Sequence, residues 1–133
     1  MIVLDASAVL ELVLRTDASS EIESRVRRPG MTLHCPHLLD LEVAQVLRWH
    51  ARGKQRVEPR VREALEDLRD LPLTRYAHEP FIDRIWELRE NLTAYDGAYV
   101  ALAETLGAIL LTSDARLART SGHQASIELV PPA

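Results

Sequence analysis

One stretch of the chain limits its possible folds more than any other: an apolar helix followed at once by a buried strand that ends in a carboxylate. Residues 95–106 carry apolar side chains at helical spacing, and Gly107 directly after them is a typical C-terminal stop. The apolar run 108–111 comes next and leads to Asp114. This succession predicts an α/β fold, in which helices and buried strands alternate along the chain.

The beginning of the chain shows the same pattern of a strand and then a carboxylate. Residues 1–4 form an apolar run long enough for a central parallel strand, and Asp5 follows it. Ser7 is the expected N-cap of the next helix. Taken alone, Asp5 is better explained as a capping or turn residue, which is common after a strand.

The remaining elements are expected to alternate in the same way. The predicted helices are 19–28, 36–52 with Pro36 in its first turn, 58–71, one that begins at Pro80, and 115–119, and the further predicted strands are 31–34, 73–76 and 127–130. In the helix after Pro80, we expect Trp86 to lie in the core.

Size and composition fit a single cytoplasmic domain. The chain has 133 residues, of which 47% are hydrophobic, and this is enough for one core. Its single cysteine, Cys35, excludes an internal disulfide and fits a reducing compartment. No membrane helix is expected, because no apolar run approaches roughly 20 residues. No signal peptide is expected, because the apolar run 1–4 has no basic segment before it. The formal net charge of −4 gives no reason to expect direct sequence-specific DNA binding.

Two further acids are expected beside Asp5 and Asp114. Ligands of open parallel sheets bind outside the carboxyl ends of the strands, which is where both of these residues stand. Asp96 falls in the first turn of its helix, where the helix dipole tolerates negative charge. Glu42 falls among apolar positions of the helix 36–52, where a carboxylate is costly unless it is paired or binds a cation. A solvated position at the edge of that face, or a pair with Arg48, explains Glu42 equally well.

Four carboxylates in one cleft would repel one another and would need cations. Because the set contains oxygen ligands and no cysteine or histidine, it favours Mg²⁺ or Mn²⁺. Ser7 and Thr112 are the expected supporting residues, which hold a water or a carboxylate in place.

The segments around these acids resemble, in order, the four motifs of PIN-domain proteins, specifically the VapC-type toxins of bacterial toxin–antitoxin pairs. The segments are 3–10, 39–47, 95–104 and 111–118, and the last two are the most specific. The chain also has the length of that family. The resemblance implies a three-layer α/β/α sandwich with a short central parallel sheet, as a single domain over residues 1–133.

The resemblance also implies a function. It implies a metal-dependent endoribonuclease, the toxic component of a type II toxin–antitoxin system, which acts in the cytoplasm as a homodimer and is inhibited by an antitoxin protein. Its catalytic and metal-binding residues would be Asp5, Glu42, Asp96 and Asp114, with Mg²⁺ or Mn²⁺ as the cofactor. Some relatives carry a further acid shortly after the fourth, whereas Ala115, Arg116 and Leu117 stand here. The resemblance therefore does not decide whether a second metal ion binds. Asp40 is left out of the site, because helix geometry turns it roughly 160° away from Glu42.

Other features of the chain have less specific explanations. The basic residues Arg48, Arg52, Lys54 and Arg56 are candidates for RNA phosphate contacts, although a solvated surface is the commoner role of such a segment. His34 and His37 have a proline-broken spacing that argues against zinc. Cys35 is expected to be buried filler, since no base can be placed beside it.

Two other functions stay open. A phosphoaspartate domain of the receiver or phosphatase type also places aspartates at strand ends. However, Ser7 stands where a haloacid-type phosphatase would have its second aspartate. Both types usually need a lysine near the phosphate, and the only lysine, Lys54, falls in a polar turn. A catalytically silent module would keep the fold only to bind a partner, and the presence of all four acids argues against it.

Overall fold

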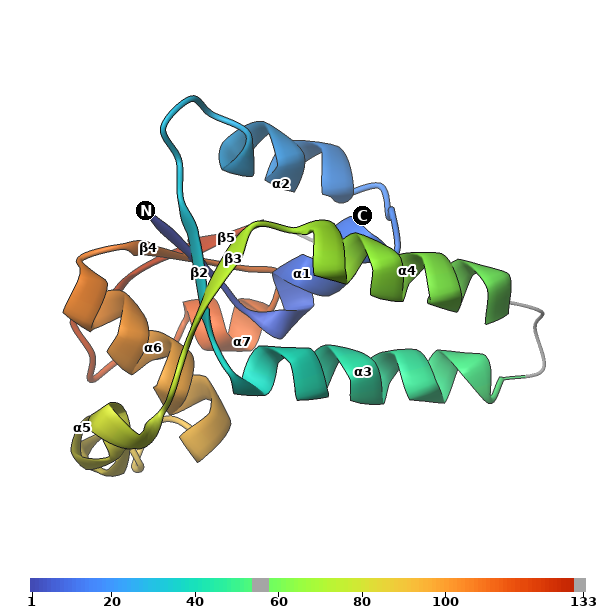
Figure 1. The fold of residues 1–133 in the computed structure, drawn as a ribbon. Coiled ribbons are helices and arrows are strands. Elements are labelled where there is room, and N and C mark those ends of the chain that lie inside the picture. Colours follow the sequence, from blue (N-terminus) through green and yellow to red (C-terminus); the bar gives the residue numbers. More distant parts are fainter. Residues whose placement is uncertain (54–57, 131–133) are drawn as a thin grey trace.

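The computed structural model describes residues 1–53 and 58–130, and it shows a five-stranded sheet between layers of helices (Figure 1). The strands are β1 (Ile2–Leu4), β2 (Leu33–Pro36), β3 (Leu73–Tyr76), β4 (Ile109–Thr112) and β5 (Ser126–Leu129). The helices are α1 (Ala6–Val13), α2 (Ser19–Val26), α3 (Leu38–Ala51), α4 (Glu58–Asp70), α5 (Ile82–Glu87), α6 (Ala94–Leu106) and α7 (Ala115–Ala118), with a 3-10 turn at Glu79–Phe81 before α5. The predicted three-layer α/β/α sandwich is confirmed. No helix in the described part of the chain is long and apolar enough to span a membrane.

The strand order is β3-β2-β1-β4-β5, and every neighbouring pair is parallel. The chain therefore builds the sheet outward from β1 to β3 and then crosses back to β4 on the other side of β1. This makes the β1–β4 junction the switch point of the sheet, the usual place for a ligand. Leu4 is paired with Leu111 there, so the segments that carry Asp5 and Asp114 leave the sheet next to each other.

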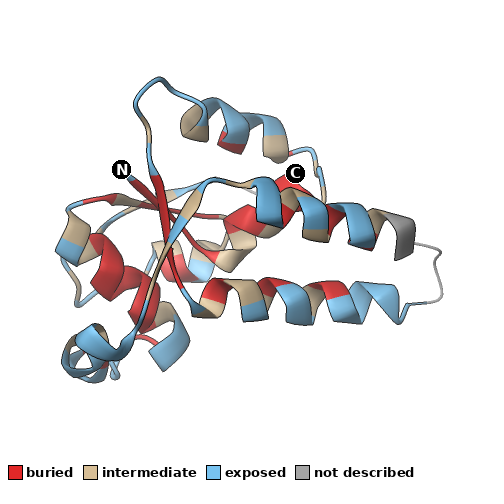
Figure 2. Ribbon diagram, in the orientation of Figure 1, coloured by how far each residue is buried: buried red, intermediate tan, exposed pale blue. Residues whose placement is uncertain are grey.

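The core lies on both faces of the central strands (Figure 2). Ile2, Val3 and Leu4 are all buried, which is typical of a central parallel strand covered on both sides. Helix α6 packs on β1, β2 and β4, and α1 packs on β4 and holds α2, α3 and α4. Burial of each fully buried aliphatic side chain contributes about 1.5–3 kcal/mol to folding. This core therefore stabilises the central strands, whose carboxyl ends lead to Asp5 and Asp114.

Helix α6 is the most buried helix, and its small residues explain how it fits. Residues 97–103 are all buried. A Cβ at Gly97 would lie 3.4 Å from Cγ2 of Ile85, which is van der Waals contact, so α5 packs directly against this part of α6. Gly107 ends α6 in the left-handed conformation with φ 61°, as the sequence predicts.

The structure corrects three local predictions. The N-cap of α1 is Asp5, whose side chain accepts a hydrogen bond from the backbone N–H of Ala8, and not Ser7. Strand β2 begins and ends two residues later than predicted. Pro36 pairs with Tyr76 of β3, so it ends a strand and does not begin a helix.

The third correction concerns Trp86, which is 66% exposed and does not lie in the core. Helix α5 has only six residues, and of these only Ile85 is buried. The guanidinium of Arg89 lies 4.6 Å from the centre of the Trp86 ring and partly covers it.

Candidate active site

The four predicted acids line one open cleft of about 570 Å³ at the carboxyl edge of the sheet. Asp5 follows β1, Glu42 comes from α3, Asp96 lies in the first turn of α6, and Asp114 lies between β4 and α7. A larger cavity of about 840 Å³ lies beside α2, α4 and the amino ends of β2 and β3, and none of these acids lines it. Position and chemistry therefore both favour the smaller cleft as the site.

Asp5 is held by three hydrogen bonds. The hydroxyl of Ser7 donates to Oδ1 at 2.7 Å, the backbone N–H of Ala8 donates to the same oxygen at 3.0 Å, and the hydroxyl of Thr112 donates to Oδ2 at 2.6 Å. The side chain is buried, and burial raises its pKa although the hydrogen bonds lower it. A carboxylate has about four acceptor positions, so Asp5 keeps one of them for a further partner. Ser7 and Thr112 thus fix the orientation of Asp5.

Glu42 is bound by a residue that sequence reasoning missed. The phenol of Tyr99 on α6 donates a hydrogen bond to Oε1 of Glu42 at 2.6 Å. Burial raises the pKa of Glu42, the bond from Tyr99 lowers it, and the charges of Asp96 and Asp5 raise it. Tyr99 follows Asp96 by three residues, so helical spacing on α6 was the signal that could have identified it.

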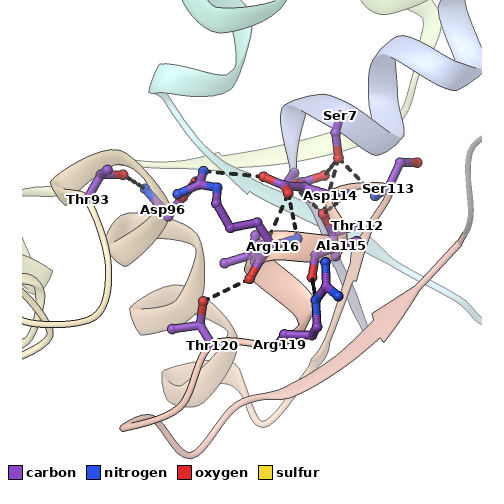
Figure 3. Close-up of polar contacts among 12 residues, drawn as sticks. Ser7, Thr93, Asp96, Thr112, Ser113, Asp114, Ala115, Arg116, Arg119 and Thr120 are labelled. Atoms are coloured by element: carbon purple, nitrogen blue, oxygen red, sulfur yellow. Dashed lines mark hydrogen bonds and ion pairs between the residues drawn. The ribbon is translucent and has the colours of Figure 1, made fainter.

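Asp96 and Asp114 share a second residue that the sequence did not assign to the site. Nη2 of Arg116 lies 3.3 Å from Oδ2 of Asp96 and 3.4 Å from Oδ2 of Asp114 (Figure 3). The other oxygen of Asp114 caps α7, because it accepts hydrogen bonds from the backbone N–H groups of Arg116 and Leu117. Burial raises the pKa of Asp96, the charge of Arg116 lowers it, and Asp114 raises it.

The donor set of the cleft fits a divalent cation of the Mg²⁺ or Mn²⁺ type. All four acids offer oxygen ligands. Burial, and after it the like charges in the cleft, raise the pKa of Asp5, Glu42 and Asp96, and a cation would relieve that repulsion. Within the described ranges, no three Asp, Glu, His or Cys side chains stand ready to hold one ion together. Their oxygens accept hydrogen bonds instead from the hydroxyl, phenol, guanidinium and backbone partners described above.

The other residues singled out in the sequence lie apart from the acids. Arg48, in the last turn of α3, and Arg52, its C-cap residue, are exposed, whereas Lys54 and Arg56 fall outside the described residues. Asp40 is bound by Arg75, with N–O distances of 2.7 and 2.9 Å.

The histidines and the cysteine do not form a site together. His34 is buried between the hydroxyls of Thr32 and Tyr76, and His37 is exposed. Burial raises the pKa of the Cys35 thiol to about 12, as expected of buried filler.

Comparisons with known proteins identify relatives of this chain. The family model described as "PIN domain" matches residues 2–123. Ribonuclease VapC12 of Mycobacterium tuberculosis is 43% identical over 130 residues, which cover 98% of this chain and 99% of that protein.

Solved structures show the same fold. PAE2754 from Pyrobaculum aerophilum has a TM-score of 0.68 and 26% identity, and the match covers 95% of this chain and 81% of that one. VapBC2 from Rickettsia felis, solved with a DNA fragment from its promoter, has a TM-score of 0.66 and 14% identity over 96% of this chain and 98% of that one.

Proposed function

This chain belongs to the PIN-domain family and to its VapC branch, and from this premise we propose that it is a metal-dependent endoribonuclease. Its role would be that of the toxic member of a type II toxin–antitoxin pair. The observation that carries the proposal is the convergence of Asp5, Glu42, Asp96 and Asp114 on one cleft at the switch point of the sheet. The ribonuclease name of the mycobacterial relative, at 43% identity, supports RNA as the substrate.

In this proposal the four carboxylates would hold Mg²⁺ or Mn²⁺, and the ion would supply the activation of water and the stabilisation of the leaving oxygen that phosphodiester hydrolysis needs. Ser7, Thr112 and the backbone of Ala8 fix Asp5, so its free acceptor position is preorganised. Tyr99 does the same for Glu42 from the neighbouring helix. Arg48 and Arg52 are the described candidates for contacts with RNA phosphates beyond the cleft.

We further propose a cognate antitoxin and a homodimer in the cytoplasm. The VapBC2 structure is that of a VapB–VapC pair, which supports a protein partner for this chain. A partner that reaches the cleft would be expected to present arginine or lysine to the carboxylates. Direct sequence-specific DNA binding by this chain itself is still not expected.

The deciding experiment is incubation of the pure protein with labelled total RNA in Mg²⁺, in Mn²⁺ and in excess EDTA. We expect cleavage with either metal, none with EDTA, and products with a 5′-phosphate and a 3′-hydroxyl, because water attacks phosphorus. Full activity in EDTA or a 2′,3′-cyclic phosphate product would contradict the proposal. No cleavage under any condition would favour a catalytically silent module instead.

A further inference from the structure

Arg116 occupies an unusual position for an arginine. A single nitrogen of its guanidinium contacts carboxylates from two different elements, Asp96 on α6 and Asp114 at the start of α7 (Figure 3). Its side chain is 71% exposed, whereas those of Asp96 and Asp114 are 19% and 33% exposed. A guanidinium stays protonated at any physiological pH, so the cleft always carries this positive charge.

The contacts of Arg116 differ from those of the structural arginines in the same molecule. Arg84 binds Glu104 through two nitrogens at 2.9 Å each, and Arg75 binds Asp40 at 2.7 and 2.9 Å. These are the short, forked pairs that fix two elements together. Arg116 instead makes longer, solvent-exposed contacts of 3.3 and 3.4 Å, a type of ion pair that contributes little to stability and exchanges readily.

We propose that Arg116 is an exchangeable internal cation: it neutralises Asp96 and Asp114 in the metal-free protein, competes with divalent cations there, and turns to a phosphate of bound RNA once a cation takes its place. The first half follows from charge and position, because a divalent ion and a guanidinium repel each other at the same two carboxylates. The second half follows from exposure and geometry. In the described chain, the side-chain hydrogen bonds of this guanidinium involve Nη2 alone, and the side chain is 71% exposed, so Nε and Nη1 keep their donor capacity for a further partner.

The phosphate half of this inference rests on the proposed ribonuclease function, and the competition half does not. Arginine suits both halves, since its fork matches carboxylate and phosphate oxygens alike. Arg116 would then be a positioning residue for the substrate strand, and one that lowers metal affinity when no substrate is bound.

The chain offers a matched control for this idea. Arg119 lies three residues further along, at the C-cap of the same short helix, and its Nε donates to the backbone carbonyl of Ala115. Arg119 is exposed and is not among the residues that line the cleft. Arg116→Gln and Arg119→Gln therefore change the net charge equally, but only the first removes the cation from Asp96 and Asp114.

The first test measures Mn²⁺ binding to the RNA-free proteins by calorimetry. We expect Arg116→Gln to bind Mn²⁺ about fivefold more tightly than the wild type, since one charge a few ångströms away in water is worth about 1 kcal/mol. Arg119→Gln should bind like the wild type, and Arg116→Lys, which keeps the charge, should lie between the two. Equal or weaker Mn²⁺ binding by Arg116→Gln would overturn the competition, because it would mean that Arg116 only holds the two carboxylates in place.

The second test measures cleavage of a labelled single-stranded RNA at saturating Mn²⁺. We expect Arg116→Gln to raise KM by about tenfold, because the variant cannot make one charged hydrogen bond to phosphate, with a smaller change in kcat. An unchanged KM would overturn the phosphate contact. If even the wild type cleaves no RNA, the proposed function fails, while the calorimetric comparison still decides whether Arg116 competes with the metal.

Discussion

Asp5 has two roles that looked like alternatives in the sequence. It caps α1 through the backbone N–H of Ala8, and it also lines the acidic cleft. A strand-end aspartate can do both, because one oxygen faces the helix while the other keeps a free acceptor position. Substitution of Asp5 would therefore confound a loss of the site with a loss of the cap, which is worth about 1 kcal/mol.

Asp96 separates the two effects, because it is not the cap of its helix. The N-cap of α6 is Thr93, whose hydroxyl accepts a hydrogen bond from the backbone N–H of Asp96. The carboxylate of Asp96 is stabilised by the weak contact with Arg116 and by the neighbouring hydroxyl of Thr93. Its burial and its like-charged neighbour both raise its pKa, so in the metal-free protein this charge works against folding.

We predict that Asp96→Asn lowers RNA cleavage by orders of magnitude and leaves the metal-free protein at least as stable as the wild type. Added Mg²⁺ should raise the melting temperature of the wild type more than that of the variant, since only bound ligand stabilises the folded state. Paired melting curves with and without Mg²⁺ measure this. Asp83→Asn, in the first turn of exposed α5, is the control and should change neither property. A variant that cleaves RNA normally would end the role of Asp96.

At the scale of elements, the sequence could predict the site as far as it depends on strand ends. Asp5 and Asp114 follow apolar runs, and parallel strands bring their carboxyl ends to one edge, so their proximity follows from the pattern. Helical spacing places Tyr99 on the same side of α6 as Asp96, but its bond to Glu42 depends on side-chain orientation, which spacing alone does not determine. The same holds for the contacts of Arg116 with the acids. The prediction for Trp86 is wrong for a similar reason, because apolar periodicity cannot show which side of a six-residue helix the described part of the chain leaves exposed.

Helices α5 and α6 are joined by an ion pair whose contribution should depend on pH. Arg84 donates to both oxygens of Glu104 at 2.9 Å, and the backbone N–H of Gln124 donates to the same carboxylate. These bonds, above all those from Arg84, hold the pKa of Glu104 below its ordinary value of 4.5. Its stabilising contribution is therefore complete above the ordinary pKa and is lost as the pH falls through the lowered one.

We predict that Glu104→Gln lowers the melting temperature at pH 7 by about 4 °C, which corresponds to about 1 kcal/mol for a domain of this size. The difference from the wild type should stay constant from pH 7 to about pH 5.5 and shrink below the ordinary glutamate pKa. Thermal melts across this range measure it. Glu87→Gln removes the exposed partner of the same arginine and should have little effect. A difference that grows toward low pH would contradict the assigned role of Glu104.

Helix α3 extends from the cleft at Glu42 to the exposed basic residues Arg48 and Arg52. We predict that Arg48→Ala with Arg52→Ala weakens binding of a labelled single-stranded RNA, measured by anisotropy in EDTA. The slope of log K against log salt should flatten by about 0.7 for each phosphate that the variant no longer neutralises. Arg27→Ala with Arg28→Ala, beside the other cavity, changes the charge equally and should have no effect. Unchanged affinity at low salt would mean that Arg48 and Arg52 do not contact RNA and are only part of a solvated surface.

At the scale of the whole molecule, large apolar side chains are exposed on the short helix α5. Ile82 and Trp86 lie four residues apart on α5, at 51% and 66% exposure, and no described residue of the chain buries them. Residues of this size at helical spacing are typical of a protein interface, in which tryptophan often carries much of the binding energy. Together with the family to which the chain belongs, they favour an interface between two copies of this chain at α5.

We therefore predict a homodimer of about 30 kDa, twice the chain mass of 15.0 kDa, in light scattering at micromolar concentration. Trp86→Glu should shift the mass to that of one chain, because a buried, unpaired carboxylate at the interface costs several kcal/mol. Trp49→Glu, at the far end of α3, introduces the same change at another exposed tryptophan and should leave the dimer intact. Circular dichroism checks that both variants keep the fold. A wild-type monomer would contradict the dimer itself, whereas a Trp86→Glu variant that still dimerises would place the interface away from α5.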